Sequence, residues 1–284
     1  MAVGAFWFSV MALLVKIAGR RLGSMEIVFF RGLITLGLSW WALDRLGIAR
    51  WGTQRRLLVF RGTLGSIALV CFFYSILHLP LGEAALIQNM NPVFATILAA
   101  LILKEHLRAP EIICLATSLL GVVFIAHPTV LFGAQGAPVD LVDIGIALMG
   151  ALCSGTAYTL VRKMRTTEHP FVIVFYLPLL SVPISLPFAL AEWRWPNAWD
   201  WVLLLGVGLT TQLAQVNMTR GLQLERTARA TTIGYLQVAF AVLWGAIVLS
   251  EIPDVWTLAG ATTIIGSTLV LSWWNSTVLG TDAA

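Results

Sequence analysis

The stretch NPVFATILAALILKE (residues 91–105) occurs a second time, in altered form, as QVAFAVLWGAIVLSE (residues 237–251). Both copies are apolar over most of their length, and both end on a glutamate, Glu105 in the first and Glu251 in the second. The two copies match at phenylalanine, alanine and leucine positions as well, 146 residues apart. This duplication indicates that the chain was built from one apolar unit used twice.

The composition decides the class of protein. Of 284 residues, 58% are hydrophobic and 11% are charged, and the mean hydropathy is +0.86. Soluble domains carry about 25% charged residues, so most of this chain must face lipid or other apolar segments. The apolar runs do not alternate with polar residues, as the strands of a membrane β-barrel do. We therefore predict an all-α integral membrane protein.

A membrane-spanning helix needs about 20 apolar residues, and the sequence holds ten such segments, which leave no room for a soluble domain. The ten predicted spans are residues 2–18, 25–43, 57–77, 83–103, 110–127, 142–161, 170–190, 201–218, 230–249 and 255–274. The first lacks the basic flank and cleavage site of a signal peptide, so we interpret it as a membrane helix. Because Met1 lies so close to this helix, a natural chain with a few more N-terminal residues is one expectation.

The 146-residue offset extends along the chain and aligns two further pairs of segments, residues 25–39 with 171–185 and residues 4–16 with 150–162. We therefore predict two five-helix halves, residues 1–127 and 142–284, joined by a linker at residues 128–141. Because five is an odd number, the second half enters the membrane from the opposite side. Inverted repeats of this kind are typical of secondary transporters, which bind substrate between the halves near the midplane.

Basic residues predict the orientation, because short cytoplasmic loops are enriched in Lys and Arg. With the N-terminus in the cytoplasm, twelve basic residues face inward and three face outward. The inward set is Arg45, Arg50, Arg55, Arg56, Lys104, Arg108, Arg162, Lys163, Arg165, Arg220, Arg226 and Arg229, and the outward set is Arg20, Arg21 and Arg194. Both termini are predicted to be cytoplasmic. The pI near 9.3 then reflects membrane topology and not a nucleic-acid partner.

Several short motifs resemble the drug/metabolite transporter superfamily, and specifically its EamA-type ten-helix exporters. They are FFRG (29–32), YSILHLPLGEAALIQNMNP (74–92), ILKE (102–105), RGLQLERTARAT (220–231) and VLSE (248–251). The resemblance covers nearly the whole chain. It implies a central cavity surrounded by predicted helices 1–4 and 6–9, with helices 5 and 10 peripheral. It also implies a location in the bacterial cytoplasmic (inner) membrane and the export of amino acids or other small metabolites, some of them aromatic.

Polar side chains inside a membrane usually face the protein interior and mark substrate pathways. Gln88 and Asn91 lie three residues apart in the fourth predicted span and share a helix face, as Gln212 and Gln215 do in the eighth. Gln237 matches Asn91 through the repeat. We predict that these five side chains bind the polar end of a substrate. Hydrogen bonds between helices are the alternative.

Arginine and aromatic residues complete the predicted substrate site. Arg31 lies inside the second predicted span, where its guanidinium is suited to bind a substrate carboxylate. The alternative is that it pairs with backbone carbonyls or with Glu26. The aromatic candidates for contact with a flat apolar side chain lie well inside their spans, where packing between helices is the alternative role; they are Trp7, Tyr74, Tyr158 and Tyr235.

Glu105 and Glu251 are predicted to have a structural role. A carboxylate is unfavourable at the C-terminus of a helix, so we expect each glutamate to cap the start of the following helix, near Pro110 and Val255. No carboxylate lies deep in a predicted span, which argues against proton coupling through an acidic residue. The three cysteines fall inside spans and are interpreted as small core residues.

The predicted function is a secondary transporter that exports small metabolites, with amino acids as the expected cargo, by alternating access. Import or exchange of a vitamin, nucleoside or drug is the alternative. An intramembrane enzyme is a remote alternative, because the four histidines form no catalytic or metal-binding motif. No catalytic residue, metal or cofactor is expected. The expected partners are a small-molecule substrate and the lipid bilayer, and the protein is a monomer or a homodimer.

Overall fold

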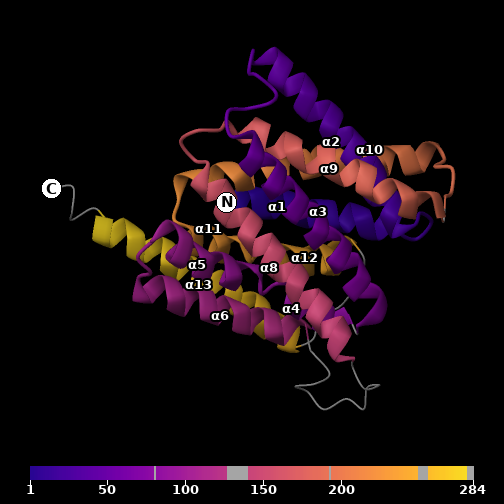
Figure 1. Ribbon diagram of the computed structural model, residues 1–284. Helices are drawn as coiled ribbons and strands as arrows, with labels where there is room; N and C mark the ends of the chain where they lie inside the picture. The colour runs from indigo at the N-terminus through magenta and orange to yellow at the C-terminus, as the bar shows by residue number, and fades with distance from the viewer. Residues whose placement is uncertain (80, 127–139, 192, 249–254, 280–284) are drawn as a thin grey trace.

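The structure, a computed structural model, describes residues 1–79, 81–126, 140–191, 193–248 and 255–279, and this part of the chain is helical without strands. Its connections are short (Figure 1). The helices are α1 (Ala2–Ala18), α2 (Ser24–Arg45), α3 (Arg55–His78), α4 (Leu81–Gln88), α5 (Asn91–Leu103), α6 (Ala109–Ala126), α8 (Leu141–Lys163), α9 (Pro170–Ala191), α10 (Ala198–Leu224), α11 (Thr227–Gly234), α12 (Leu236–Val248) and α13 (Val255–Leu279).

Local sequence signals explain where two of the long helices begin. Asn197 caps α10 by accepting a hydrogen bond from the backbone N–H of Asp200, whose carboxylate accepts one from the N–H of Asn197 in return. Asp140 caps α8 by accepting a hydrogen bond from the N–H of Val142 at 3.0 Å. Each cap satisfies backbone donors that the first turn of a helix leaves unpaired.

Two of the predicted spans are each broken into two helices. α4 ends at Gln88 and α5 begins at Asn91, and α11 ends at Gly234 while α12 begins at Leu236. The last residues before the two breaks, Gln88 and Gly234, are separated by the 146-residue offset of the repeat. Pro92 is the second residue of α5, where the missing N–H removes no helical hydrogen bond. The second break, which holds no proline, is one residue shorter.

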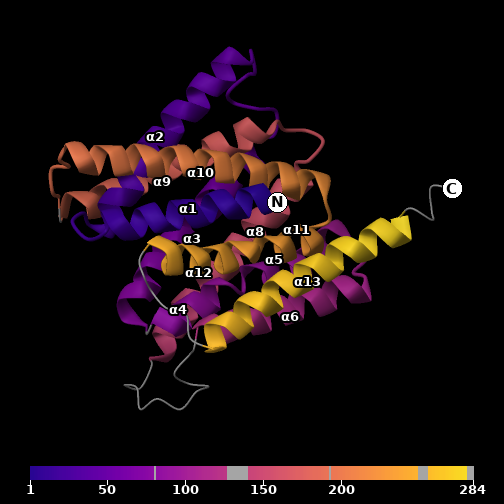
Figure 2. The same cartoon turned by 180° about the vertical axis from the view of Figure 1, so that it is seen from behind.

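The helices pack as a bundle with two distinct sides. α6 and α13 run along each other on one side, and α2, α9 and α10 form the other (Figures 1 and 2). α1 packs on α10 and on α12, while α3 and α5 both pack on α8. The α6–α13 contact is close, since a Cβ at Gly121 would lie 2.8 Å from the carbonyl oxygen of Gly260. This contact joins the two helices that the resemblance places at the periphery.

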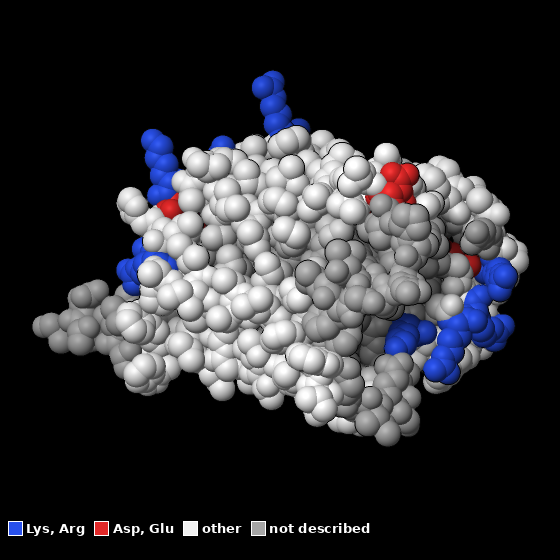
Figure 3. All heavy atoms as spheres, turned by 90° about the horizontal axis from the view of Figure 1, so that it is seen from below, with Lys and Arg blue, Asp and Glu red and all other residues white. Residues whose placement is uncertain are grey.

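The outer surface is suited to lipid. Within the described chain, seven helical spans are long and apolar enough to cross a membrane, and α1 and residues 255–271 of α13 are shorter apolar helices. α3, which begins with Arg55 and Arg56, is not among the seven, so the count of ten spans stays a prediction. Large apolar side chains such as Leu101 and Leu269 are exposed. Lys and Arg gather mainly toward the ends of the bundle, and the surface between them is largely uncharged (Figure 3).

Candidate functional site

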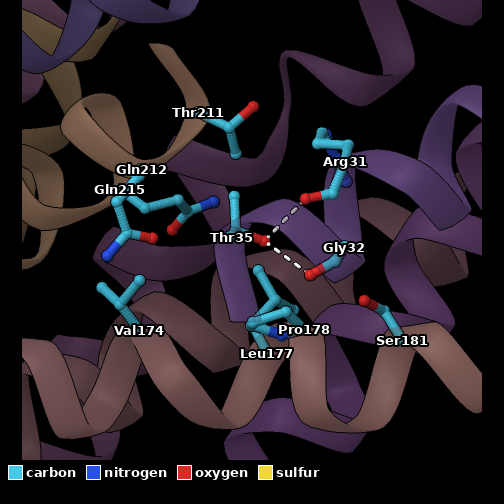
Figure 4. Close-up of a pocket in the computed structure, with 10 residues that line it drawn as sticks. All are labelled: Arg31, Gly32, Thr35, Val174, Leu177, Pro178, Ser181, Thr211, Gln212 and Gln215. Atoms are coloured by element: carbon cyan, nitrogen blue, oxygen red, sulfur yellow. Dashed lines mark hydrogen bonds between the residues drawn. The ribbon is translucent and has the colours of Figure 1, made fainter. Parts of the chain in front are cut away.

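A small cavity lies between α2, α9 and α10, in the middle of the bundle's length. Thr35, on its wall, lies about 16 Å from the start of α2 and about 15 Å from its end. The cavity volume is about 10 Å³, which is room for about one water molecule. Its lining residues are Arg31, Gly32 and Thr35 of α2, Val174, Leu177, Pro178 and Ser181 of α9, and Thr211, Gln212 and Gln215 of α10 (Figure 4).

One glutamine of the cavity wall is fixed in place, and another is not. The amide of Gln212 forms two hydrogen bonds with the hydroxyl of Ser39, at 2.9 and 3.1 Å. The side-chain oxygen of Gln215 and the hydroxyl of Thr211 are buried without a hydrogen-bond partner in the described structure. Buried polar atoms are nearly always paired, so these two groups are available to a ligand.

Pro178 leaves a backbone carbonyl of the same wall without its helical donor. Pro178 lies inside α9 and has no N–H, so it cannot donate the helical hydrogen bond to the carbonyl oxygen of Val174. Both residues line the cavity. In a membrane, such unpaired backbone groups are tolerated where they are buried in protein or line a cavity. The carbonyl of Val174 and the amide oxygen of Gln215 therefore belong to residues that line the same cavity.

Arg31 is the charged residue of the cavity wall. Its Nη1 donates to the sulfur of Met11 on α1 at 3.9 Å, and a thioether is a weak acceptor. Neither of the alternatives expected from the sequence is seen, because in the described chain the Arg31 guanidinium has no hydrogen bond to a backbone carbonyl and no ion pair with Glu26. A guanidinium has five N–H donors, and most of those of Arg31 lack a strong acceptor.

The polar cluster combines Arg31 of the first predicted half with Gln212 and Gln215 of the second, and it is not repeated at the positions that the 146-residue offset relates to them. The 146-residue offset places Leu177 opposite Arg31, and Ser66 and Leu69 opposite Gln212 and Gln215. The positions that the sequence repeat relates therefore differ here in chemistry. Because the equivalent positions hold Leu177 in the second predicted half and Leu69 in the first, the helix plan does not itself require a charge or an amide there.

The other predicted glutamine and asparagine positions gather at the two helix breaks. Gln88 and Asn91 flank the first break, and Gln237 follows the second. The breaks contact each other directly, because the hydroxyl of Tyr235 donates to the carbonyl oxygen of Asn89 at 2.7 Å. Tyr235 is buried, so it joins the two broken helices through a carbonyl that the break has freed. These residues form a second polar group outside the cavity lining.

The three remaining aromatic candidates lie in packing contacts. Trp7 packs edge-on against Phe6 of α1. Tyr158 is partly buried against the largest apolar core cluster. The hydroxyl of Tyr74 donates to the carboxylate of Asp143, near the start of α8, at 2.9 Å. The structure places none of the three in the cavity lining.

Glu105 joins three helices at the end of the bundle that the sequence predicts to be cytoplasmic. Its carboxylate pairs with the guanidinium of Arg162, at the end of α8, at 2.8 Å, and accepts from the backbone N–H of Thr227, the first residue of α11, at 3.0 Å. Arg162 also donates to the carbonyl of Gln223 at 2.6 Å. Glu105 therefore caps the start of α11 and not that of the following helix α6. Glu251 lies outside the described residues.

Sequence reasoning missed several cavity residues that carried a recognisable signal. Arg31, Thr35 and Ser39 are spaced four residues apart and form one polar stripe on α2. Thr211 precedes Gln212, and Pro178 stands inside an otherwise apolar helix. The spacing of four residues is itself the signal that marks this polar face of α2.

Comparison with known proteins agrees with this architecture. The chain matches the EamA-like transporter family over residues 1–127 and 143–273. It is 31% identical to the pseudopaline exporter CntI of Pseudomonas aeruginosa (strain UCBPP-PA14) over 271 residues, which cover 95% of this chain and 93% of that protein. It is 27% identical to human solute carrier family 35 member G1 over 288 residues, covering 96% of this chain and 79% of that protein.

A solved crystal structure shares the fold. It superposes with a TM-score of 0.83 at 16% sequence identity, covering 96% of this chain and 95% of that chain. At this identity the likeness concerns the fold alone.

Proposed function

We propose that this chain, which belongs to the EamA-like transporter family of the drug/metabolite transporter superfamily, exports small metabolites from bacteria, with amino acids as its cargo. Its location is the cytoplasmic membrane, with both termini inside. The exporting relative in Pseudomonas aeruginosa supports the direction of transport. The observation that carries the proposal is the cavity between α2, α9 and α10, where the side-chain oxygens of Thr211 and Gln215 lack partners in the described structure.

The chemistry of the cavity supports an amino acid as cargo. Arg31 offers a cation for a carboxylate, and the oxygens of Gln215 and Val174 offer acceptors for an amino group. Thr211 provides a hydroxyl that donates to or accepts from either group. The side chain of Leu177 completes the wall on the apolar side. Cargo-binding roles for Gln88, Asn91 and Gln237 remain part of the proposal, with these residues at the helix breaks.

Two inverted five-helix halves account for the arrangement of helices. The two broken spans are interrupted at positions 146 residues apart, which is the repeat offset. Tyr235 at the second break contacts Asn89 at the first. The packing partners also exchange under the repeat, because α1 on α10 corresponds to α3 on α8. Broken helices near the midplane of an inverted repeat are typical of secondary transporters.

The size of the cavity supports alternating access. With a volume of about 10 Å³, the cavity has no room for an amino acid, so cargo enters only after helices move apart. The ion pair of Glu105 with Arg162 joins the end of α8 to the connection between α5 and α6 at the predicted cytoplasmic end. We propose that this pair opens when cargo is loaded from the cytoplasm.

Replacing Gln215 with leucine should reduce transport at least about tenfold, because the amide that meets the polar end of the cargo is lost. Leucine is the residue that the repeat places at the equivalent position, Leu69, so it suits a membrane interior. The measurement is counterflow of a panel of labelled amino acids into proteoliposomes.

The matched control is Asn217→Leu on the same helix, whose amide donates to the carbonyl of Leu213 and does not line the cavity. Its flux should stay within about twofold of wild type, because the polar groups of the cavity are unchanged. Unchanged flux in Gln215→Leu contradicts this placement of the site. Flux of a vitamin or nucleoside in place of every amino acid overturns the choice of cargo.

A further inference from the structure

Among the described residues, the charged side chains that lie more than one turn from either end of a helix are all cations. Arg31 is the eighth residue of α2 and Arg61 the seventh of α3, so each lies about 10 Å inside its helix. Every carboxylate-bearing residue of the described chain lies instead in the first or last turn of a helix, at a cap or in a connection. Cations without carboxylates in a membrane interior create a positive potential along the path of the cargo.

Arg61, like Arg31, lies inside its helix without an ion pair to a carboxylate in the described structure. Its side chain is 2% exposed, and its Nη1 donates to the carbonyl of Ile173 at 3.5 Å. Its Nε has no partner in the described structure. Ile173 precedes Val174, which lines the cavity, so the second cation lies next to the cytoplasmic side of the wall. Arg61 and Arg31 thus follow each other along α9 from the predicted cytoplasmic half to the outer half.

The charge balance selects between classes of cargo. A zwitterionic amino acid in the cavity leaves the charge of Arg31 uncompensated, since no lining residue that the structure describes is acidic. A cargo with one carboxylate more than its amino groups forms a neutral complex with Arg31. A buried charge is tolerated far better when it is paired, so the anion binds more tightly than its neutral analogue.

We propose that the cargo is a net anion, an acidic amino acid or a related small metabolite with an excess carboxylate, and that the membrane potential drives its export. This inference rests on the proposed function. Because the inside of a bacterial membrane is negative, each exported anion moves down the potential. No acidic group for proton coupling is then required. For one charge, the equilibrium concentration ratio changes tenfold for about each 59 mV.

The test uses proteoliposomes of the full chain and two isosteric pairs of labelled probes, glutamate with glutamine and aspartate with asparagine. Valinomycin with a tenfold potassium gradient, high outside, makes the interior positive by about 59 mV. Glutamate or aspartate should then accumulate inside by up to about tenfold, and the matching amide should not accumulate. The initial rate for the acid should exceed that for its amide at least about tenfold, because pairing with a charged group is lost in the amide.

Arg31→Gln should lower the rate for the acid at least about tenfold and abolish the preference for acid over amide, while Arg31→Lys keeps the preference because it keeps the charge. Arg20→Gln, an exposed residue of the preceding connection, is the control and should keep both rate and preference. Thermal unfolding in detergent establishes that each variant is folded.

Three results overturn the inference. Flux of the amides that equals or exceeds that of the acids refutes the anionic cargo and leaves the proposed function standing. Flux of the acids without accumulation refutes the drive by membrane potential, again without touching the proposed function. Absence of flux for all four probes overturns this inference, and the panel of labelled amino acids then decides separately whether the proposed function stands.

Discussion

Replacing Arg162 with methionine is expected to lower the free energy of unfolding by about 3 kcal/mol, because it leaves the partly buried carboxylate of Glu105 without its charge partner. The Arg162 side chain is 7% exposed and that of Glu105 is 14% exposed, so solvent screens the pair little. The substitution also removes the hydrogen bond to the carbonyl of Gln223 at the end of α10. The measurement is equilibrium or thermal unfolding in detergent.

An exposed pair of similar geometry provides the control. Arg229 and Glu225 approach to 2.8 Å within one turn, with side chains 20% and 42% exposed, and Glu225→Gln should cost only about 0.3–0.5 kcal/mol. The double variant Arg162→Met with Glu105→Gln should be more stable than Arg162→Met alone, since the unpaired charge is gone. A loss for Arg162→Met no larger than that for Glu225→Gln contradicts a structural role for the buried pair.

Replacing Gly155 with alanine is expected to destabilise the protein by about 3 kcal/mol, near the upper end of the usual cost of overpacking. A Cβ at Gly155 would lie 2.8 Å from the backbone N of Ala95, 2.8 Å from the Cβ of Phe94 and 2.9 Å from the carbonyl oxygen of Asn91. These are backbone and Cβ atoms, so no flexible side chain can yield, and α5 must move away from α8. The movement also stretches the hydrogen bond from Thr159 to the carbonyl of Ala95, 3.2 Å in the structure.

Gly145 of the same helix supplies the matched control, because a Cβ there meets nothing within 4 Å. Gly145→Ala should leave stability unchanged or raise it by up to about 1 kcal/mol through helix propensity. Unfolding of the two variants in parallel separates close packing from propensity. Equal stability of Gly155→Ala and Gly145→Ala contradicts the contact between α8 and α5.

Hydropathy predicted much of the fold, since the first span was expected at residues 2–18 and α1 runs from Ala2 to Ala18. The repeat offset indicated that the fourth and ninth predicted spans have the same pattern of residues. The sequence did not indicate that both breaks meet through Tyr235 and the carbonyl of Asn89. Every residue has a backbone carbonyl, so the amino-acid sequence does not reveal which carbonyl a helix break leaves free.

Partner choice was also beyond prediction from the sequence. Glu105 was expected to serve its neighbour in the chain, but it caps α11, 122 residues away, because Glu111 already accepts from the backbone N–H of Arg108 at the start of α6. For the cavity, hydropathy identified Gln212, Gln215 and Arg31 as polar groups inside spans. It did not identify which spans would face one another, since every helix of the bundle has an apolar face.

Alternating access of the cavity between α2, α9 and α10 is the central claim, and accessibility of a single thiol at Thr211 tests it most directly. The three native cysteines are replaced by alanine, Thr211→Cys is introduced, and a membrane-impermeant thiol reagent is applied to vesicles of each orientation. Thr262→Cys on the exposed face of α13 is the control, which cargo should not protect. If the cavity opens to each side in turn, the reagent should label residue 211 from both sides of the membrane, and glutamate should slow the labelling. Labelling from one side only, or labelling that glutamate does not slow, contradicts this claim.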